Sequence, residues 1–484
     1  MTYLLALLPI LLLVAISLTK GVKPAVLVSC AVTTGLFFYW GAGGSHLLGT
    51  LAVSLLTTVN ILLIVLGAVF LYSVMQHTGL ITQLTHSLDE LHPSKELRFF
   101  LLAIGLTAFF EGVAGFGTPG AIVPLILIAL GFEAVLSVSV VLLLNGLFAA
   151  FGAVGTPVLI GLKVPLNLAL AEVKTIGVAA ALLIAVAGLV VLALVLRLVG
   201  RAQGPLANRP QVLLLYAFIM LPFCGLAWLV PELATVLGAL LMLALAVLYF
   251  RQKGTRLNLW PWLPYGGLAL LLLLPRLLPP LREALSWELA FEDLFGSGIR
   301  GGIKPLQSPF LPFVAVALGV AFVRKTGALP LREPLGKMGS VFVVLFPSVV
   351  IAQLMINSGV TQPSMVGYLA ELLSGLGRLY PIFAPFIGVV GTFITGSTTI
   401  SNLVFGASQQ HTAVALGISP PLVLALQLVG ASLGNAICLF NIIAAASVAN
   451  IKDHKAVLAN TLLPTLLAAL AAGLLGMGWL LVSG

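Results

Sequence analysis

One acidic residue and two glycine-containing stretches mark the part of the sequence that could carry out chemistry. Residues 109–120 hold four glycines, a proline and Glu111 between apolar runs, and residues 395–402 read Thr-Gly-Ser-Thr-Thr-Ile-Ser-Asn. Glycine and proline break helices, and unwound backbone at membrane depth is tolerated only where protein or a water-filled cavity surrounds it. Both stretches therefore predict a re-entrant hairpin or broken helix. A kink or a loop turn is the alternative for each.

Broken helices direct N-terminal N–H groups and positive dipole ends into such a cavity, which suits an anion. A third interruption, at 151–157, and several polar side chains in apolar surroundings extend this pattern. Each asparagine or glutamine alone could instead make an interhelical hydrogen bond. We predict a small organic anion as substrate, bound by Gly115, Gly117, Thr118, Asn145, Thr156, Ser397, Thr398, Thr399, Ser401, Asn402, Gln409, Asn435 and Asn441.

Glu111 is the only acidic residue in either of the two stretches. An ionised carboxylate at membrane depth is costly, so we predict that Glu111 carries a proton together with the substrate. A structural glutamate that accepts hydrogen bonds from hairpin N–H groups is the alternative. Sodium is a second candidate for the coupling ion, because exposed carbonyl groups of broken helices coordinate it. We predict no cofactor and no metal site.

The composition defines the elements that must position these groups. Of 484 residues, 60% are apolar and 8% charged, whereas soluble domains are about 25% charged. At about 20 residues per span, this indicates an all-α polytopic membrane protein of roughly 12–14 membrane segments within a lipid bilayer. A transmembrane barrel is excluded because the apolar runs are continuous. Nucleic-acid binding is excluded because the net charge of +9 lies in short clusters between spans.

The positions of the spans and charges predict a topology. Plain spans are expected at 3–18, 22–40, 61–75, 176–199, 212–230, 233–250, 265–278, 309–323, 341–355 and 458–482. Positive charges gather in alternate connections, at 197–209, 251–256 and 324–337, which predicts that these connections are cytoplasmic. The first run is followed, not preceded, by Lys20 and Lys23, unlike a signal peptide. We therefore expect a multi-pass protein of the cytoplasmic (inner) membrane with its N-terminus outside.

The order of elements recurs along the chain. From Ile61 and again from Val341, a span, a polar stretch, a half-span, a break, a helix, a second break and a final span follow one another, about 280 residues apart. The charges place the two units in opposite orientations, which predicts inverted repeats. The expected organisation is N-terminal spans at 1–58, a first repeat at 59–199 with its hairpin at 111–120, a central four-span segment at 200–323, and a second repeat at 324–484 with its hairpin at 395–402. The central segment is expected to serve as a scaffold or as the contact of a homodimer.

At these motifs the sequence resembles the L-lactate permease family. The family pattern EGxAGFGxP, a Leu-Gly-Phe turn, an Asn and AFGAxGxP match residues 111–119, 130–132, Asn145 and 150–157. The second-half pattern of TGS, SNxxF and a Gln matches 395–397, 401–405 and Gln409. The resemblance covers about 50–200 and 340–455. It implies a symporter that moves L-lactate, glycolate or a related 2-hydroxy monocarboxylate with a proton, and a transport domain that moves against a scaffold.

Two positions depart from the family pattern. Thr398 stands where the family usually has Asp, and Asn435 stands where it usually has Lys. The two changes remove both members of a plausible ion pair, because losing one alone would leave a buried charge unpaired. They leave open a different substrate or an altered coupling, with Glu111 as the leading proton carrier.

Three other classes of function are weighed against this one. A sodium-coupled carrier of another organic anion could use the same hairpins, and a passive anion channel would conduct without accumulation. An intramembrane enzyme is not expected, because the sequence has no His-Glu-x-x-His, Gly-x-Ser-x-Gly or phosphate-loop motif.

Overall fold

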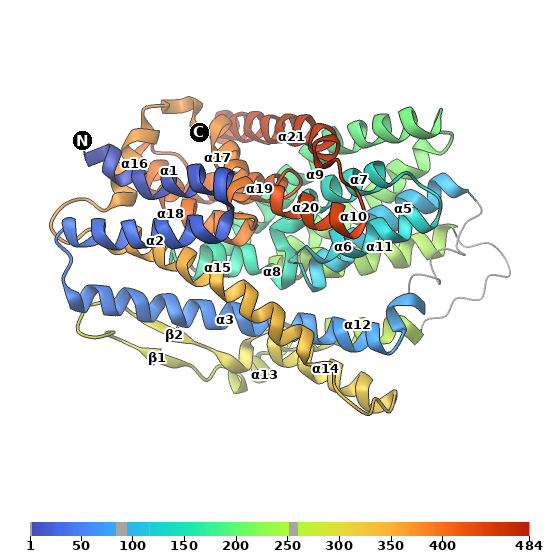
Figure 1. The fold of residues 1–484 in the computed structure, drawn as a ribbon, viewed down its shortest axis with the longest axis horizontal. Helices are drawn as coiled ribbons and strands as arrows, with labels where there is room; N and C mark the ends of the chain where they lie inside the picture. The colour runs from blue at the N-terminus through green and yellow to red at the C-terminus, as the bar shows by residue number, and fades with distance from the viewer. Residues whose placement is uncertain (1, 84–93, 116, 251–259, 484) are drawn as a thin grey trace. The chain divides into compact units, whose positions relative to one another are not determined.

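The computed structural model describes residues 2–83, 94–115, 117–250 and 260–483. Phe116 of the first motif, part of the polar stretch before Arg98 and the basic cluster at 251–256 therefore lie outside the described residues. Helices make up nearly all of the remainder (Figure 1).

The described ranges contain nine helices that are long and apolar enough to cross a membrane. They are Gly44–His77, Ala134–Lys163, Leu170–Gln203, Arg209–Leu229, Pro231–Phe250, Arg332–Asn357, Gly377–Thr395, Pro420–Ala446 and His454–Val482. Shorter apolar helices occur at Thr2–Leu13, Lys23–Tyr39, Thr118–Ala129, Phe310–Val323 and Met365–Ser374. The prediction of an all-α, multi-pass integral membrane protein is confirmed. The orientation of the N-terminus and the identity of the membrane stay predictions.

The chain forms two compact units, each built from separate stretches of sequence. The first unit comprises Met1–Ala42, Phe99–Ala246 and Pro347–Gly484, and the second comprises Gly43–Arg98 and Val247–Phe346. These units describe compactness, whereas the boundaries expected from the sequence describe a repeat. The repeat boundaries, and the scaffold role of residues 200–323, stay predictions.

Two runs of helices in the first unit follow the same order. The first run is α5 (Lys95–Val113), α6 (Thr118–Ala129), α7 (Ala134–Phe148), α8 (Gly152–Val158) and α9 (Leu170–Gln203). The second is α17 (Tyr380–Thr395), α18 (Thr398–Ala415), α19 (Pro420–Gly434), α20 (Leu439–Val448) and α21 (His454–Ser483). The helices are thus interrupted at the glycine-containing stretches. Their inverted relation and their depth in the membrane stay predictions.

The same turn closes the second helix of each run. Gly131 and Gly417 have positive φ angles of 82° and 65°. The N–H of Phe132 donates to Leu127 O, and that of Ile418 donates to Ala413 O. Each turn therefore ends its helix with a left-handed glycine, which satisfies carbonyl groups of the last helical turn. This is why an Ala-Leu-Gly sequence precedes both α7 and α19.

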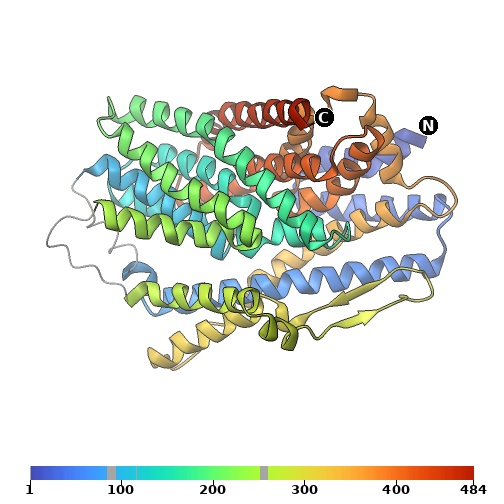
Figure 2. The same cartoon turned by 180° about the vertical axis from the view of Figure 1, so that it is seen from behind.

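Helix α19 lies at the centre of the first unit. It contacts α7, α9, α17, α18 and α21, and its residues from Leu422 to Gly434 are buried. Glycines allow the close approach of α17: a Cβ on Gly430 would lie 1.8 Å from Pro385 O, and one on Gly434 would lie 2.7 Å from Val389 O. Small residues at such contacts let two helix backbones pack against each other inside a membrane. Helix α21 packs against both α17 and α19 and is the dark red helix along the upper edge in Figure 2.

The N-terminal helices α1 (Thr2–Lys20) and α2 (Val22–Tyr39) belong to the same unit. At the end of α2, Trp40 Nε1 donates to Pro363 O at 3.0 Å, and Thr361 Oγ1 donates to Trp40 O at 2.9 Å. These bonds join the start of the chain to the segment before α16 (Met365–Ser374).

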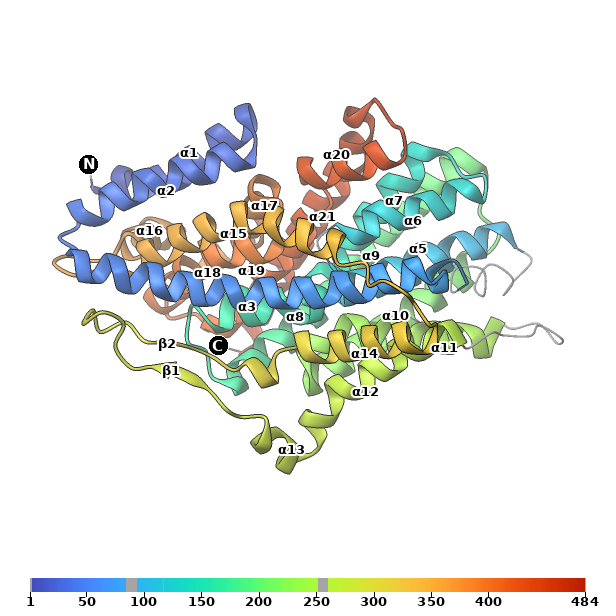
Figure 3. The same ribbon diagram turned by 60° about the horizontal axis from the view of Figure 1, so that its bottom comes forward.

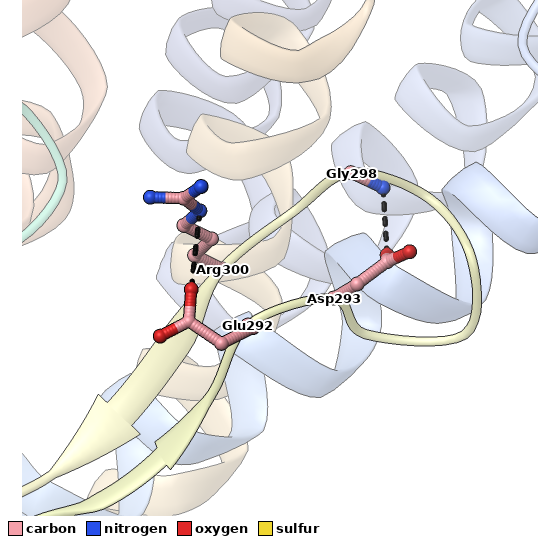
Figure 4. A network of polar contacts seen from close by, with 4 residues as sticks. All are labelled: Glu292, Asp293, Gly298 and Arg300. Atoms are coloured by element: carbon pink, nitrogen blue, oxygen red, sulfur yellow. Dashed lines mark hydrogen bonds and ion pairs between the residues drawn. The ribbon is translucent and has the colours of Figure 1, made fainter.

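The second unit contains α3 (Gly44–His77), α12 (Leu263–Leu277), α13 (Pro279–Ala284) and α14 (Phe310–Val323), with α14 alongside α3 (Figure 3). Strands β1 (Leu289–Phe291) and β2 (Gly301–Ile303) pair antiparallel, with Ala290 opposite Gly302. At the loop end of this hairpin, Gly298 N–H donates to Asp293 Oδ1 at 2.7 Å and Arg300 Nε lies 3.6 Å from Glu292 Oε2 (Figure 4). The sequence predicted no strands.

The contact between α17 and α19 yields a stability prediction. Gly430→Ala should destabilise the protein by about 1–3 kcal/mol, because overpacking forces backbone shifts. The effect is measured as the thermal unfolding midpoint in detergent, with loss of monodispersity as the readout of unfolding. Gly478→Ala in α21 is the control, since a Cβ there meets no described atom within 4 Å. Equal unfolding midpoints for the two variants would contradict the packing described.

Candidate functional site

A cavity of about 50 Å³ lies in the first unit, where four helix interruptions meet. The interruptions are those after α5, after α7, between α17 and α18, and between α19 and α20. Its lining residues are Glu111, Gly117, Ala149, Gly152, Ala153, Thr156, Pro157, Gly396, Ser397, Thr398, Thr399, Asn435 and Asn441.

Most of the residues that the sequence predicted for the site come together here. Glu111, Gly117, Thr156, Ser397, Thr398, Thr399, Asn435 and Asn441 all line the cavity. Asn145 does not line it but is bonded to two residues that do. Thr118 is the first residue of α6, directly after Gly117. A Cβ on Gly115, which has φ 55°, would lie 2.9 Å from the Cβ of Ala153, at the edge of the site.

Ser401, Asn402 and Gln409 lie in a second polar cluster on the same helix, α18. Asn402 Nδ2 donates to Pro157 O at 3.1 Å, and Ser401 Oγ donates to Gly388 O at 2.9 Å. Gln409 Nε2 donates to Gln427 Oε1 at 2.8 Å, and its Oε1 accepts a hydrogen bond from Tyr380. These hydrogen bonds hold α18 against α17, α19 and Pro157.

The carboxyl group of Glu111 fits in its position because residue 152 is a glycine. A Cβ built on Gly152 would lie 2.1 Å from Glu111 Oε1. The other carboxyl oxygen, Oε2, accepts a hydrogen bond of 2.7 Å from Asn145 Nδ2. The sequence singled out the stretch that contains Gly152 as a helix break, but it gave no sign that this glycine faces the carboxyl group.

The backbone beside Gly152 is left-handed over three consecutive residues. Ala153, Val154 and Gly155 have φ angles of 43°, 55° and 73°. Left-handed geometry is strained for alanine and more so for the β-branched valine, and such strain persists only where surrounding packing enforces it. Here the packing comes from Glu232 in the turn Pro231–Leu233: a Cβ on Gly155 would lie 2.4 Å from Glu232 Cα.

Asparagine side chains link Glu111 by hydrogen bonds to two other residues that line the cavity. Asn145 Oδ1 accepts from Asn435 Nδ2 at 2.7 Å, and Asn435 Oδ1 accepts from Asn441 Nδ2 at 2.5 Å. Asn441 Nδ2 also lies 3.2 Å from the backbone oxygen of Asn435. The four residues come from α5, α7, the end of α19 and α20. Sequence reasoning chose all four residues but could not give their order.

Helix N-termini supply the positive potential of the site. Ser397 caps α18, its Oγ accepting from Ile400 N–H at 3.4 Å, and Thr398 and Thr399 form the first turn. Helix α6 begins after Gly117, whose left-handed φ of 79° turns the chain into the helix. The first N–H groups of a helix have no intrahelical acceptor and attract anions. Among the described residues that line the cavity, none carries a positive charge.

The left-handed stretch at 153–155 yields a paired prediction. Gly155→Ala and Gly417→Ala should each lose about 1–2 kcal/mol for placing alanine in left-handed geometry. Gly155→Ala should lose about 1–3 kcal/mol more, because its Cβ meets the backbone of Glu232, whereas a Cβ on Gly417 meets no described atom within 4 Å. Thermal unfolding of the purified variants compares their stabilities. Equal losses of stability in the two variants would contradict the clash between position 155 and Glu232.

Comparison with known proteins gives the family. The sequence profile of the L-lactate permease family matches residues 2–258 and 311–481. A relative from Haemophilus influenzae is 27% identical over 458 residues, 85% of each chain. The L-lactate permease of Streptococcus iniae is 27% identical over 396 residues, 74% of this chain and 79% of that one. The glycolate permease of Escherichia coli (strain K12) is 24% identical over 446 residues, 77% and 76% of the two chains. The chain therefore belongs to the L-lactate permease family and is a membrane transporter, not an enzyme.

Proposed function

We propose that this protein is a symporter that moves a short 2-hydroxy monocarboxylate, L-lactate or glycolate, together with a proton across the cytoplasmic membrane. The names of its relatives, L-lactate permease and glycolate permease, support the substrate class. The observation that carries the proposal is a single cavity in which one buried carboxyl group lies beside helix N-termini, with no cationic side chain among its described lining residues.

The size of the cavity favours a small substrate. With about 50 Å³, the cavity suits a molecule of a few non-hydrogen atoms. L-Lactate and glycolate belong to this size class, whereas sugars and tricarboxylates do not. The hydroxyl groups of Thr156 and Thr399, which lie 3.5 Å apart, are available to a 2-hydroxyl group.

The substrate carboxylate is assigned to the N-terminus of α18. The hydroxyl groups of Ser397, Thr398 and Thr399 lie there with the N–H groups of Thr398 and Thr399, which precede the capped N–H of Ile400. Hydrogen bonds to an anion are stronger than those to neutral groups. Neutral donors and the helix dipole thus replace the cation that the family pattern usually supplies at position 435.

Glu111 is assigned as the proton carrier. Its side chain is buried, and its hydrogen-bond partner is the neutral amide of Asn145. A carboxylate without a cation is costly to bury, and a substrate anion entering the same cavity adds to that cost. Protonation of Glu111 removes one of the two negative charges, so the proton and the anion favour each other's binding.

This proposal yields a transport prediction. In proteoliposomes with an inward proton gradient, the protein should accumulate radiolabelled L-lactate, and a protonophore should collapse the accumulation. Glu111→Gln should abolish accumulation, because its amide keeps the size of the carboxyl group but cannot release a proton. The matched control is Glu292→Gln on the exposed hairpin, which should accumulate as the unchanged protein does.

Each other outcome has a definite meaning. Accumulation that survives in Glu111→Gln would remove Glu111 from coupling. Accumulation that requires sodium at fixed pH, tested by exchange for potassium, would replace the proton with sodium. Flux without saturation or accumulation would indicate a channel. Folded protein that takes up no L-lactate or glycolate would refute the substrate assignment.

The departure at position 398 gives a second transport prediction. Thr398 and Asn435 line the same cavity. Thr398→Asp should raise KM for L-lactate at least about tenfold, because like charges placed side by side cost several kcal/mol. Adding Asn435→Lys should lower KM again, since the lysine neutralises the new carboxylate. Uptake kinetics of the single and double variants, with Thr398→Ser as the uncharged comparison, measure this. A single variant with unchanged KM would place the carboxylate elsewhere.

A further inference from the structure

Glu111 itself lines the cavity, and a chain of three asparagines connects it to Asn441, another lining residue, through hydrogen bonds that all run in one direction. Asn145 donates to Glu111, Asn435 donates to Asn145, and Asn441 donates to Asn435, at 2.7, 2.7 and 2.5 Å. Each Nδ2 thus lies toward Glu111. Asn145 and Asn435 are 290 residues apart, so the chain of amides crosses between the two helix runs.

This direction fits an ionised Glu111. A carboxylate only accepts hydrogen bonds, whereas an asparagine has a donor end and an acceptor end. A carboxylate therefore fixes Asn145 with its Nδ2 inward, and each following asparagine must adopt the same sense. At the far end, the acceptor Oδ1 of Asn441 lies on the Gly117 side, 3.9 Å from where a Cβ of Gly117 would be. An acceptor at the cavity opposes the binding of an anion.

Protonation of Glu111 permits the opposite direction. The new O–H can donate to Asn145 Oδ1, after which Asn145 Nδ2 can donate to Asn435 Oδ1 and Asn435 Nδ2 to Asn441 Oδ1. Asn441 then presents its Nδ2 to the cavity as a donor and gives up its hydrogen bond of 3.2 Å to the backbone oxygen of Asn435. The proton comes from water and stays on a Glu111 oxygen. The asparagines keep all their covalent bonds and only rotate their amide groups about Cβ–Cγ.

We propose that Asn145, Asn435 and Asn441 form a reversible amide relay that converts protonation of Glu111 into a hydrogen-bond donor for the substrate anion in the cavity. The relay rests on the proposed function and supplies its coupling step. Asn145, which does not line the cavity, acts as a positioning residue. A lysine at position 435 would prevent the reversal, because an ammonium group has donors and no acceptor.

Glu111 can act on the substrate through its charge, because it lines the cavity, and through its hydrogen bond to the first amide of the relay. On the α7 side it meets Asn145, and on the α8 side it meets Gly152. Of the described residues that line the cavity, no other is charged or titratable. The nearest acidic side chain described beyond α8, Glu232, packs against Gly155 on the turn Pro231–Leu233.

The test is the pH dependence of L-lactate binding to the purified full-length protein, measured by calorimetry. If binding takes up one proton, the Kd of the unchanged protein should rise about tenfold per pH unit above the titration of Glu111. In Asn145→Leu, Glu111 stays in the cavity and still repels the anion by its charge, but the relay is cut, so the rise of the Kd over the same range should be clearly smaller than in the unchanged protein. Asn460→Leu is the matched control, because its amide bonds Ser139 outside the relay, and it should keep the full dependence.

The outcomes separate the relay from the proposed function. A Kd of the unchanged protein that does not depend on pH would refute proton-coupled binding, and the relay with it. A full pH dependence in both the unchanged protein and Asn145→Leu would refute the relay alone. If Asn145→Leu does not fold, Asn435→Leu cuts the chain one amide further along. Its Kd should also rise less with pH than that of the unchanged protein, and a rise of full size would refute the relay.

Discussion

The burial of a carboxyl group without a cation is the constraint on which the rest of the site depends. Glu111 fits because position 152 has no side chain, and Gly152 is followed by backbone in left-handed geometry. That geometry is enforced by the turn Pro231–Leu233, against which Gly155 packs with no room for a Cβ. Asn145, which bonds the carboxyl group, also meets Asn435 because α7 packs against α19, where Ser432 Oγ donates to Gly146 O at 2.8 Å. Glycine placement and helix packing thus hold one acid in reach of the cavity.

The absence of a cation among the described lining residues also defines the electrostatics of the site. A fixed lysine would bind an anion at any pH at which it stays charged. Helix N-termini provide a weaker potential that is screened by neighbouring dipoles. In such a site a change of one unit charge at Glu111 is a large fraction of the total field, so protonation can decide whether an anion binds.

Local chemistry explains what the sequence could predict. Glycine gathered with proline or hydroxyl residues predicts helix breaks, and the interruptions near Gly117, Thr156 and Ser397 are found, whereas the single Pro385 lies inside α17. Apolar run lengths gave the helices in the same way. The sequence predicts Gln409 at the site because it lies in apolar surroundings and matches the Gln of the family pattern, but it bonds Tyr380 and Gln427 instead. Its position depends on how α18 packs, which no short pattern encodes.

The rest of the site depends on contacts between distant residues. The order Glu111, Asn145, Asn435, Asn441 follows from the packing of four elements, and each asparagine alone reads as an ordinary interhelical hydrogen bond. The role of Gly152 depends likewise on a side chain from another helix. The β1–β2 hairpin was not expected because its strands are three residues each and carry no alternating pattern.

The first unit is built from stretches that are far apart in the sequence, and this has a consequence for the synthesis of the protein. Residues Phe99–Ala246 share this unit with Pro347–Gly484. Glu111 and Asn145 can bond each other early, but Asn145 Oδ1 finds its partner Asn435 only when the last third of the chain is synthesised. At about 5–20 residues per second, the interval between Asn145 and Asn435 is on the order of tens of seconds. During that time the first run resides in the membrane without the partners that the second run supplies. Insertion of this protein thus requires either a provisional arrangement of the early helices or their shelter by the insertion machinery until the C-terminal helices arrive.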